Sequence, residues 1–258
     1  MGINKYKYIY GPVPSWRLGS SLGVDPLSQE DKICSFDCLY CQIGKTTIHT
    51  RKRKVFVSSR NIIEELKSLP PVRIDFITFS GRGEPTLAKN LGKMIAGVRG
   101  TRKEPIAVIT NSSSFCDKEV RNDLSQADFV LAKLDAPSEK SFKKINKPVK
   151  GISLLKEVEG MRTFLKTYKG KFALQIMFMK ENEKYAKEIA QLARQIRADE
   201  VQLNTPLRPC GVKPLSKKKM EEIKKHFKGL TTISVHESAR KKVTPVSKKD
   251  TLIRRGKI

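Results

Sequence analysis

At 258 residues, the chain contains no segment near the roughly 20 consecutive apolar residues of a membrane span. Its N-terminus, MGINKYKYIYGP, also lacks the apolar core of a signal peptide, so we expect a cytoplasmic protein without a membrane role. The chain has 52 lysines and arginines against 26 acidic residues, a formal charge of +26. This charge favours a nucleic acid as partner, because each phosphate that a basic side chain neutralises releases counterions. The alternative is that the whole proteome is basic.

The first segments of the chain are extended or irregular. Residues 6–10, YKYIY, alternate enough for a strand or an extended arm, and Ser20–Asp25 can form the strand that leads into the next loop. Between them, residues 11–19 read GPVPSWRLG, and two prolines with two glycines predict irregular structure. In this segment Trp16 and Arg17 either contact substrate or cofactor, or belong to a packed N-terminal flap.

Three cysteines then follow within eight residues. Cys34, Cys38 and Cys41 are spaced C-x-x-x-C-x-x-C, with Tyr40 just before the last. Clustered thiolates can hold an iron–sulfur cluster, and three ligands leave one iron of a four-iron cluster open, as in metal sites that bind a substrate or cofactor. A zinc site is the alternative. Its fourth ligand would have to come from Cys116, Cys210 or His49.

A run of four basic residues follows the cysteines: Arg51, Lys52, Arg53 and Lys54. A short run of this kind is usually a solvated loop. Because it stands next to the cysteine segment in a strongly basic chain, we expect it to contact the phosphates of a nucleic acid.

From Ser58 onward, helical and strand patterns alternate. The strands are expected at residues 73–79, 106–109, 129–134, 172–178, 200–204 and 232–235. Such alternation predicts an α/β fold with a parallel sheet and right-handed crossovers. We expect residues 1–236 to form the core domain, including the N-terminal flap. Residues 237–258, with eight basic and two acidic residues and little apolar periodicity, are expected to form an extended or weakly ordered tail.

Two motifs together resemble the radical S-adenosylmethionine (SAM) superfamily: the cysteine motif and the segment SGRGEPT at residues 80–86. Within that superfamily, GPVPSWRLG is similar to the start of the GPVPSRRLG-type Fe–S oxidoreductases, which are grouped with tRNA wyosine-type enzymes. Trp16 replaces an arginine of that pattern, and Arg82 departs from the superfamily's glycine-glycine-glutamate motif. The upstream cysteine set of wyosine-forming relatives is absent, which argues against wyosine synthesis itself.

The resemblance implies a partial (β/α)6, TIM-like barrel. It also implies a 4Fe–4S cluster, held by Cys34, Cys38 and Cys41, that reductively cleaves SAM to a 5′-deoxyadenosyl radical. Active sites of α/β barrels lie at the carboxyl ends of the strands, where the cofactor contacts are expected. These are Tyr40 near the adenine, Gly81, Gly83 and Glu84 at the SAM amino group, Lys133 at its carboxylate, Ser112 or Asp135 at the ribose, and Asn111, Gln175 and Asn204 completing the ring.

Ordinary structural roles compete with several of these assignments. Glu84 can be an acid that stabilises a helix N-terminus, Asn111 and Ser112 are common turn residues, and Asp135 can simply precede a helix. Cys210 follows the strand at 200–204 and could be a further catalytic thiol, a hydrogen-atom donor or a ligand.

Three functional hypotheses remain open on the sequence. The first is modification of an RNA base, with tRNA as the partner and a ferredoxin or flavodoxin as electron donor. The second is radical modification or activation of a protein or peptide. The third is a metal-bearing RNA-binding module without catalysis. Nothing in the sequence predicts the oligomeric state.

Overall fold

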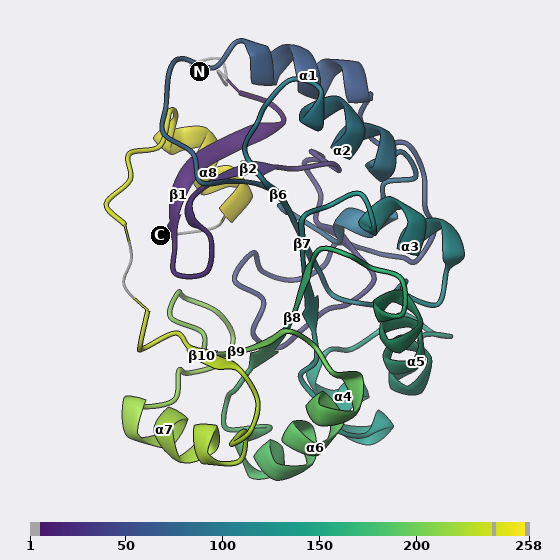
Figure 1. Ribbon diagram of the computed structural model, residues 1–258, viewed down its shortest axis with the longest axis vertical. Helices are drawn as coiled ribbons and strands as arrows, with labels where there is room; N and C mark the ends of the chain where they lie inside the picture. The colour runs from purple at the N-terminus through teal and green to yellow at the C-terminus, as the bar shows by residue number, and fades with distance from the viewer. Residues whose placement is uncertain (1–5, 239–240, 256–258) are drawn as a thin grey trace.

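The computed structural model describes residues 6–238 and 241–255 and is built around one curved eight-stranded sheet (Figure 1). The order of its strands is β1-β2-β5-β6-β7-β8-β9-β10, and every pair except the antiparallel β1–β2 is parallel. The strands are β1 (Ile9–Ser15), β2 (Gly19–Val24), β5 (Phe76–Phe79), β6 (Ile106–Thr110), β7 (Phe129–Lys133), β8 (Lys171–Met177), β9 (Glu200–Asn204) and β10 (Thr232–Ser234). The predicted α/β fold, an open barrel of parallel strands, is confirmed.

Helices cover the outer face of the sheet (Figure 1). They are α1 (Ser59–Lys67), α2 (Leu91–Arg99), α3 (Lys118–Leu124), α4 (Glu139–Ile145), α5 (Leu154–Leu165), α6 (Ala186–Ile196) and α7 (Lys217–Lys225), with 3-10 turns η1 (Pro85–Leu87) and η2 (Glu183–Tyr185). Serine side chains start several of them as N-caps; Ser58, for example, accepts a hydrogen bond from Asn61 N–H. The main hydrophobic core lies between these helices and the sheet.

Side chains on the inner face of the sheet change from apolar to polar toward the carboxyl ends of the strands. A small second core holds Leu18, Ala107, Phe129, Leu131 and Ala173, which lie near the amino ends or in the β1–β2 turn. Because side chains alternate between the two faces of a strand, the inward positions further along include Thr78, Gln175 and Asn204. The inner face of the sheet is therefore apolar toward the amino ends of the strands, which we call the floor, and polar toward their carboxyl ends.

Residues 11–15 of the segment expected to be irregular belong to strand β1, and residues 16–18 form the turn to β2. The prolines are tolerated because β1 is an edge strand of the sheet, and its register with β2 shifts between Tyr10 and Val13. The prediction of irregular structure is therefore wrong for residues 11–15, while the turn at residues 16–18 agrees with it.

The C-terminal segment is also more ordered than expected, because it contains helix α8 (Lys248–Arg255). Figure 1 shows the chain leaving β10 and returning to the opposite edge, where α8 lies against β1. Gly11 N–H donates to Thr251 Oγ1 at 3.0 Å, and Tyr6 N–H donates to Asp250 Oδ2 at 3.1 Å. The exposed side chains of α8 include Leu252 and Ile253, whereas its buried ones are Asp250, Thr251 and Arg254, so the helix docks through polar groups.

Candidate active site

The three clustered cysteines lie in one loop that begins in a two-stranded ribbon. Strand β3 (Ile33–Cys34) pairs with β4 (Ile48–His49), and the thiols of Cys34, Cys38 and Cys41 are free and partly buried. Side-chain amides approach two of the sulfurs: Asn111 Nδ2 lies 3.6 Å from Cys34 Sγ, and Asn146 Nδ2 lies 3.6 Å from Cys38 Sγ. Amide donors at this distance suit a sulfur that carries negative charge.

The thiols influence one another. Burial raises the pKa of Cys34 to about 12, and the Glu84 carboxylate and Cys41 add to the effect. Burial also raises the pKa of Cys38, with Cys34, Asp135 and Cys41 contributing. Within residues 6–238 and 241–255, no three His, Cys, Asp or Glu side chains converge on a position for a single metal ion. In an iron–sulfur cluster each cysteine can bind a different iron, so three separate thiols match that larger group.

Glycine is required where the segment SGRGEPT meets the cysteine ribbon. A Cβ atom on Gly83 would lie 1.9 Å from the carbonyl oxygen of Ile33, the residue before Cys34. Glu84 N–H donates to that carbonyl at 3.2 Å. A Cβ on Gly81 would lie 2.3 Å from Cγ of Asp25, whose carboxylate accepts a hydrogen bond from Arg82 N–H. Gly83 therefore lets this loop approach the cysteine ribbon, and Gly81 lets it approach the end of β2. Contact of either glycine with SAM stays a prediction.

The Glu84 side chain is directed into the protein, and its expected contact with the SAM amino group stays a prediction. It is 2% exposed, and its carboxylate accepts hydrogen bonds from Thr86 N–H at 3.1 Å, Thr86 Oγ1 at 2.7 Å and Thr110 Oγ1 at 2.6 Å. It also accepts one from Asn111 N–H at 2.6 Å. Burial raises the pKa of Glu84. Through these bonds Glu84 positions the loop and β6, while its Oε2 accepts only the bond from Asn111 N–H.

Asp135 is likewise occupied, at the centre of a buried network. Its carboxylate accepts hydrogen bonds from Tyr40 Oη, from Asn146 Nδ2 at 2.8 Å and from Met177 N–H at 2.8 Å. This network ties the cysteine loop to the ends of β7 and β8, and it replaces the expected ribose contact. Ser112 is fully buried and donates to the carbonyl oxygen of Lys133 at 2.9 Å, so its expected ribose contact is corrected too.

Lys133 forms a buried ion pair, and its expected contact with the SAM carboxylate stays a prediction. Its ammonium lies 3.2 Å from Asp135 Oδ1 and 4.7 Å from the centre of the Tyr40 ring. Within the described residues this buried Nζ forms no hydrogen bond, which leaves its donors available to a ligand.

A cavity of about 280 Å³ occupies the interior of the open barrel. Four residues expected at the site line it: Arg17, Gly81, Gln175 and Asn204. Gln42 and Ile43 also line it, directly after Cys41 in the chain. The cysteine loop therefore borders the cavity.

Comparison with known proteins bears on both the fold and the cysteine motif. The radical SAM superfamily profile matches residues 32–193, which include the three cysteines and SGRGEPT. The chain belongs to the radical SAM superfamily. A UPF0026 protein of Synechocystis sp. is 39% identical over 210 residues, covering 81% of this chain and 78% of the relative. A UPF0026 protein of Methanocaldococcus jannaschii is 39% identical over 223 residues, covering 84% and 68%.

A solved structure shares the fold at low identity. SuiB of Streptococcus suis, bound to SAM, superposes with a TM-score of 0.61 at 12% sequence identity over 84% of this chain. Its complex with the precursor peptide SuiA gives a TM-score of 0.62. This chain spans about half of the length of SuiB. The comparison therefore shows the barrel and leaves the substrate open.

As a radical SAM enzyme, the protein uses a 4Fe–4S cluster and SAM. The residues fit these groups. Three thiols in one loop supply the ligand type that iron–sulfur clusters require. The buried ammonium of Lys133 fits a ligand with a carboxylate, such as SAM.

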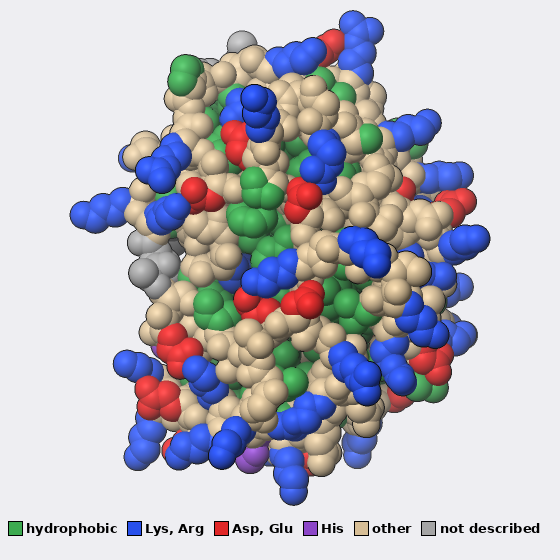
Figure 2. Space-filling model, in the orientation of Figure 1, with side chains coloured by type: hydrophobic (Ala, Val, Ile, Leu, Met, Phe, Trp, Pro, Cys, Tyr) green, Lys and Arg blue, Asp and Glu red, His purple; other side chains and the backbone are tan. Residues whose placement is uncertain are grey.

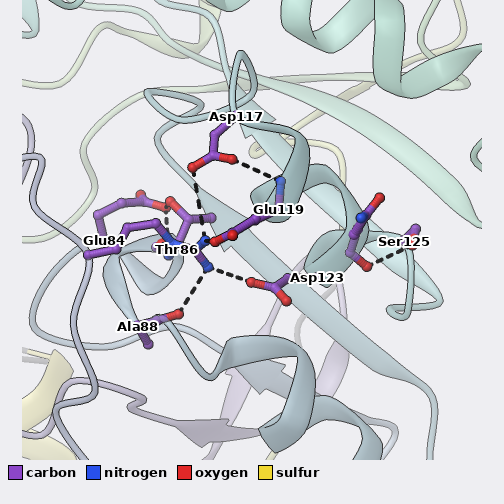
Figure 3. A network of polar contacts seen from close by, with 9 residues as sticks. Glu84, Thr86, Ala88, Asp117, Glu119, Asp123 and Ser125 are labelled. Atoms are coloured by element: carbon purple, nitrogen blue, oxygen red, sulfur yellow. Dashed lines mark hydrogen bonds and ion pairs between the residues drawn. The ribbon is translucent and has the colours of Figure 1, made fainter.

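The basic run splits into two kinds of side chain. Lys52 and Lys54 are exposed, and Arg51 is exposed with a hydrogen bond to Gly151 O at 3.4 Å. Arg53 instead has 11% of its side chain exposed and forms ion pairs with Asp123 at 2.5 Å, Glu119 at 3.3 Å and Asp117 at 4.0 Å. Figure 3 labels these three acids together with Thr86 and Ala88. Its guanidinium also donates to the carbonyl oxygens of Thr86 and Ala88. Arg53 thus anchors η1 to α3, and its expected phosphate contact is corrected.

Cys210 lies beside the cysteine loop but outside the cavity. Its thiol donates to Val212 O at 3.3 Å, and it is not among the described residues that line the cavity. A Cβ on the next residue, Gly211, would lie 3.0 Å from Leu39 O, so this loop packs on the cysteine loop. Cys210 therefore belongs to a loop that packs on the cysteine loop, and its expected catalytic role stays a prediction.

Several residues of the site were not predicted from the sequence. Asn146 follows a short helix, yet it contacts Cys38, Tyr40 and Asp135. The others are Asp25, Arg208, Arg254 and Arg255. For Asp25 the position at the end of a predicted strand was a usable signal; for Asn146 there was none.

Proposed function

We propose that this radical SAM enzyme modifies a base of RNA, with tRNA as the substrate. The observation that carries the proposal is the charge of +26, together with exposed basic residues next to the cysteine loop. Thr50 N–H donates to Cys34 O at 3.0 Å, so the run that contains Lys52 and Lys54 starts at the cysteine ribbon. Figure 2 shows Lys and Arg side chains around the whole outline of one face, which suits a large polyanion.

The proposed site has two parts. Cys34, Cys38 and Cys41 are assigned as ligands of the cluster, and Tyr40, Gly81, Gly83, Asn111 and Lys133 as residues that surround SAM. When bound, the cluster and SAM supply one-electron chemistry that yields a 5′-deoxyadenosyl radical. The chain contributes the positions of these groups: Asn111 and Asn146 fix the cysteine loop, and the Lys133 ammonium binds the SAM carboxylate.

The cavity is proposed as the place where the target base lies. Gln175 and Asn204 line it and have side-chain amides that can hydrogen-bond to a base. Its floor, formed around Leu18 and Ile109, is apolar and keeps water from the reacting groups. The electron is proposed to come from a ferredoxin or flavodoxin. The free cysteines fit a reducing compartment, in line with the cytoplasmic location that we propose.

A protein or peptide substrate is the second candidate. The observation that favours it is the shared fold with SuiB, which was solved with a precursor peptide. As a radical SAM enzyme, the protein does not fit the third hypothesis, a module without catalysis.

The test is whether RNA stimulates SAM cleavage. Protein reconstituted without oxygen is reduced with dithionite, and 5′-deoxyadenosine is quantified with no addition, with total tRNA and with a peptide library. We expect tRNA to raise the yield and a variant with Cys34, Cys38 and Cys41 changed to alanine to give none. Stimulation by peptides and not by tRNA would replace the proposal with the second candidate.

A further inference from the structure

Four arginines wall the cavity inside the barrel. Arg17, Arg208, Arg254 and Arg255 line it, and the described lining residues include no aspartate or glutamate. A positively charged, partly enclosed space of this kind attracts anions, because the low-dielectric walls screen the charge less than water does.

The arginines come from three segments that lie outside the parallel strands. Arg17 is in the β1–β2 turn, Arg208 follows β9, and Arg254 and Arg255 end α8. A guanidinium N–H of Arg208 donates to the carbonyl oxygen of Arg255, so the loop after β9 and the C-terminal helix meet. Because β1 and β10 are the two edges of the sheet, these segments close the open side of the barrel.

Arg254 is the most buried of the four. It is 6% exposed, and its terminal nitrogens donate to the backbone oxygens of Lys7 and Asp250. Within the described residues its Nε forms no hydrogen bond. Carbonyl oxygens satisfy donors without neutralising the charge, so an anion in the cavity would be stabilised by Arg254.

Two buried acids, Asp25 and Asp250, lie near this wall, and neither lines the cavity. Asp250 is one turn before Arg254 on α8, and its carboxylate accepts a hydrogen bond from Tyr6 N–H. The Asp25 carboxylate accepts hydrogen bonds from Leu27, Ser28 and Arg82 N–H groups. Burial raises the pKa of Asp25, and those hydrogen bonds and the charge of Arg254 act in the opposite direction. Asp25 therefore lies within electrostatic reach of the wall but is held by its own loop.

The rest of the cavity suits the sugar and base of a nucleotide. Two hydroxyl pairs line it, Tyr10 with Ser80 at 2.6 Å and Ser21 with Thr78 at 2.7 Å. Hydroxyl groups both donate and accept, as recognition of a ribose requires. Trp16 also lines the cavity, with the Arg17 guanidinium 5.0 Å from its ring, and an aromatic ring is a stacking surface for a base.

We propose that this arginine wall, completed by the C-terminal helix, binds the phosphate of a single nucleotide whose base stacks on Trp16. The pocket thus takes one nucleotide unit out of a strand, and guanidinium groups match phosphate oxygens in geometry as well as charge. The identification of that nucleotide as part of an RNA rests on the proposed function; the phosphate site does not.

The test is a binding experiment that needs no turnover. Reconstituted protein with its cluster and saturating SAM, without reductant, is titrated by calorimetry with each ribonucleoside 5′-monophosphate and with the matching nucleoside. For at least one base we expect the monophosphate to bind about tenfold or more tightly. Arg208→Gln and Arg255→Gln should each remove most of this difference and leave nucleoside affinity unchanged. Trp16→Leu should weaken both ligands.

Lys248→Gln is the matched control, because Lys248 is exposed, belongs to α8 and does not line the cavity. Equal affinity for nucleotide and nucleoside with every base would overturn the proposal. So would a loss in Lys248→Gln equal to that in the arginine variants, or undiminished binding in the double variant Arg208→Gln/Arg255→Gln. Circular dichroism of each variant verifies folding.

A short RNA hairpin, titrated in parallel, separates the two sources of a nucleotide. Arginine-dependent binding of the hairpin supports a nucleotide within RNA. Arginine-dependent binding of free monophosphates alone would keep the phosphate site and overturn RNA as the substrate.

Discussion

The Glu84 carboxylate accepts a hydrogen bond from Asn111 N–H at 2.6 Å, and the Asn111 side-chain amide lies 3.6 Å from Cys34 Sγ. The two residues are 27 positions apart and join the loop after β5 to the end of β6. Through this connection an acid that is hardly exposed fixes the position of a group next to the first cysteine. Glu84 is therefore a positioning residue.

Replacing Glu84 by glutamine should destabilise the fold by about 1–3 kcal/mol, because the amide presents an N–H group toward donors that now bind a carboxylate. Urea unfolding measures this change. Glu64→Gln is the control, since its side chain is 57% exposed and should change stability by less than about 0.5 kcal/mol. Unchanged stability with weaker SAM binding would show instead that Glu84 contacts SAM directly.

Gly83→Ala should displace the cysteine ribbon, since its Cβ would lie 1.9 Å from a backbone oxygen that cannot rotate away. We expect a lower melting temperature and a substoichiometric iron content after reconstitution. Gly100→Ala is the matched control, because its Cβ would find only ordinary contacts at 3.6 Å and its φ of −70° suits alanine. Full iron content in Gly83→Ala would contradict the close packing of the two loops.

Glu157 on α5 gives a pH-dependent prediction. It is 4% exposed, its Oε1 forms no hydrogen bond within the described residues, and burial raises the pKa of its carboxyl well above 4.5. Four neighbouring acidic groups add to this shift, and Lys133 lines the same small gap. The four groups are Glu139, Glu84, Asp135 and Cys116.

Because the folded-state pKa is raised, the stability contributed by Glu157 is full below pH 4.5 and is lost as pH rises through the raised value. Glu157→Gln should therefore be more stable than wild type by about 1–3 kcal/mol near pH 8, with a smaller difference near pH 5. Urea unfolding at both pH values tests this, with exposed Glu159→Gln as control. Destabilisation by the same amount at both pH values would refute a neutral buried carboxyl.

The basic run should separate into binding and structural residues. Lys52→Gln and Lys54→Gln should each make the affinity for tRNA less dependent on salt, with the plot of log affinity against log salt concentration less steep by about one. The stability of the protein should be unchanged. Arg53→Gln should destabilise the protein by about 1–3 kcal/mol, because the partly buried Asp123 and the carbonyl oxygens of Thr86 and Ala88 lose their partner. Fluorescence anisotropy and urea unfolding measure the two effects. A stable Arg53→Gln with the largest loss in salt slope would reverse the assignment.

The sequence was sufficient for the parts of the site that depend on local pattern. The spacing of Cys34, Cys38 and Cys41 and the alternation of strands led to the cluster loop and the barrel. The strand-end rule placed Gln175 and Asn204 at the cavity. These features depend on residues close together in the chain or on a repeating period.

Other features depended on which way a side chain turns. Arg53 and Lys54 are neighbours in one charge run, but only Arg53 faces the acids of α3. Glu84 matches a ligand motif, yet its carboxylate turns toward Thr110 and Asn111. The arginine wall joins residues from positions 17 to 255, and only closure of the barrel by α8 brings them together.

The most direct test of an RNA-modifying radical SAM enzyme is nucleoside mass spectrometry. Total tRNA is incubated with reconstituted protein, SAM and reductant, digested and compared with a reaction that contains the variant without Cys34, Cys38 and Cys41. We predict a nucleoside with a changed mass that appears only with the intact cysteines and SAM. An unchanged nucleoside profile, while 5′-deoxyadenosine accumulates, would contradict RNA as the substrate.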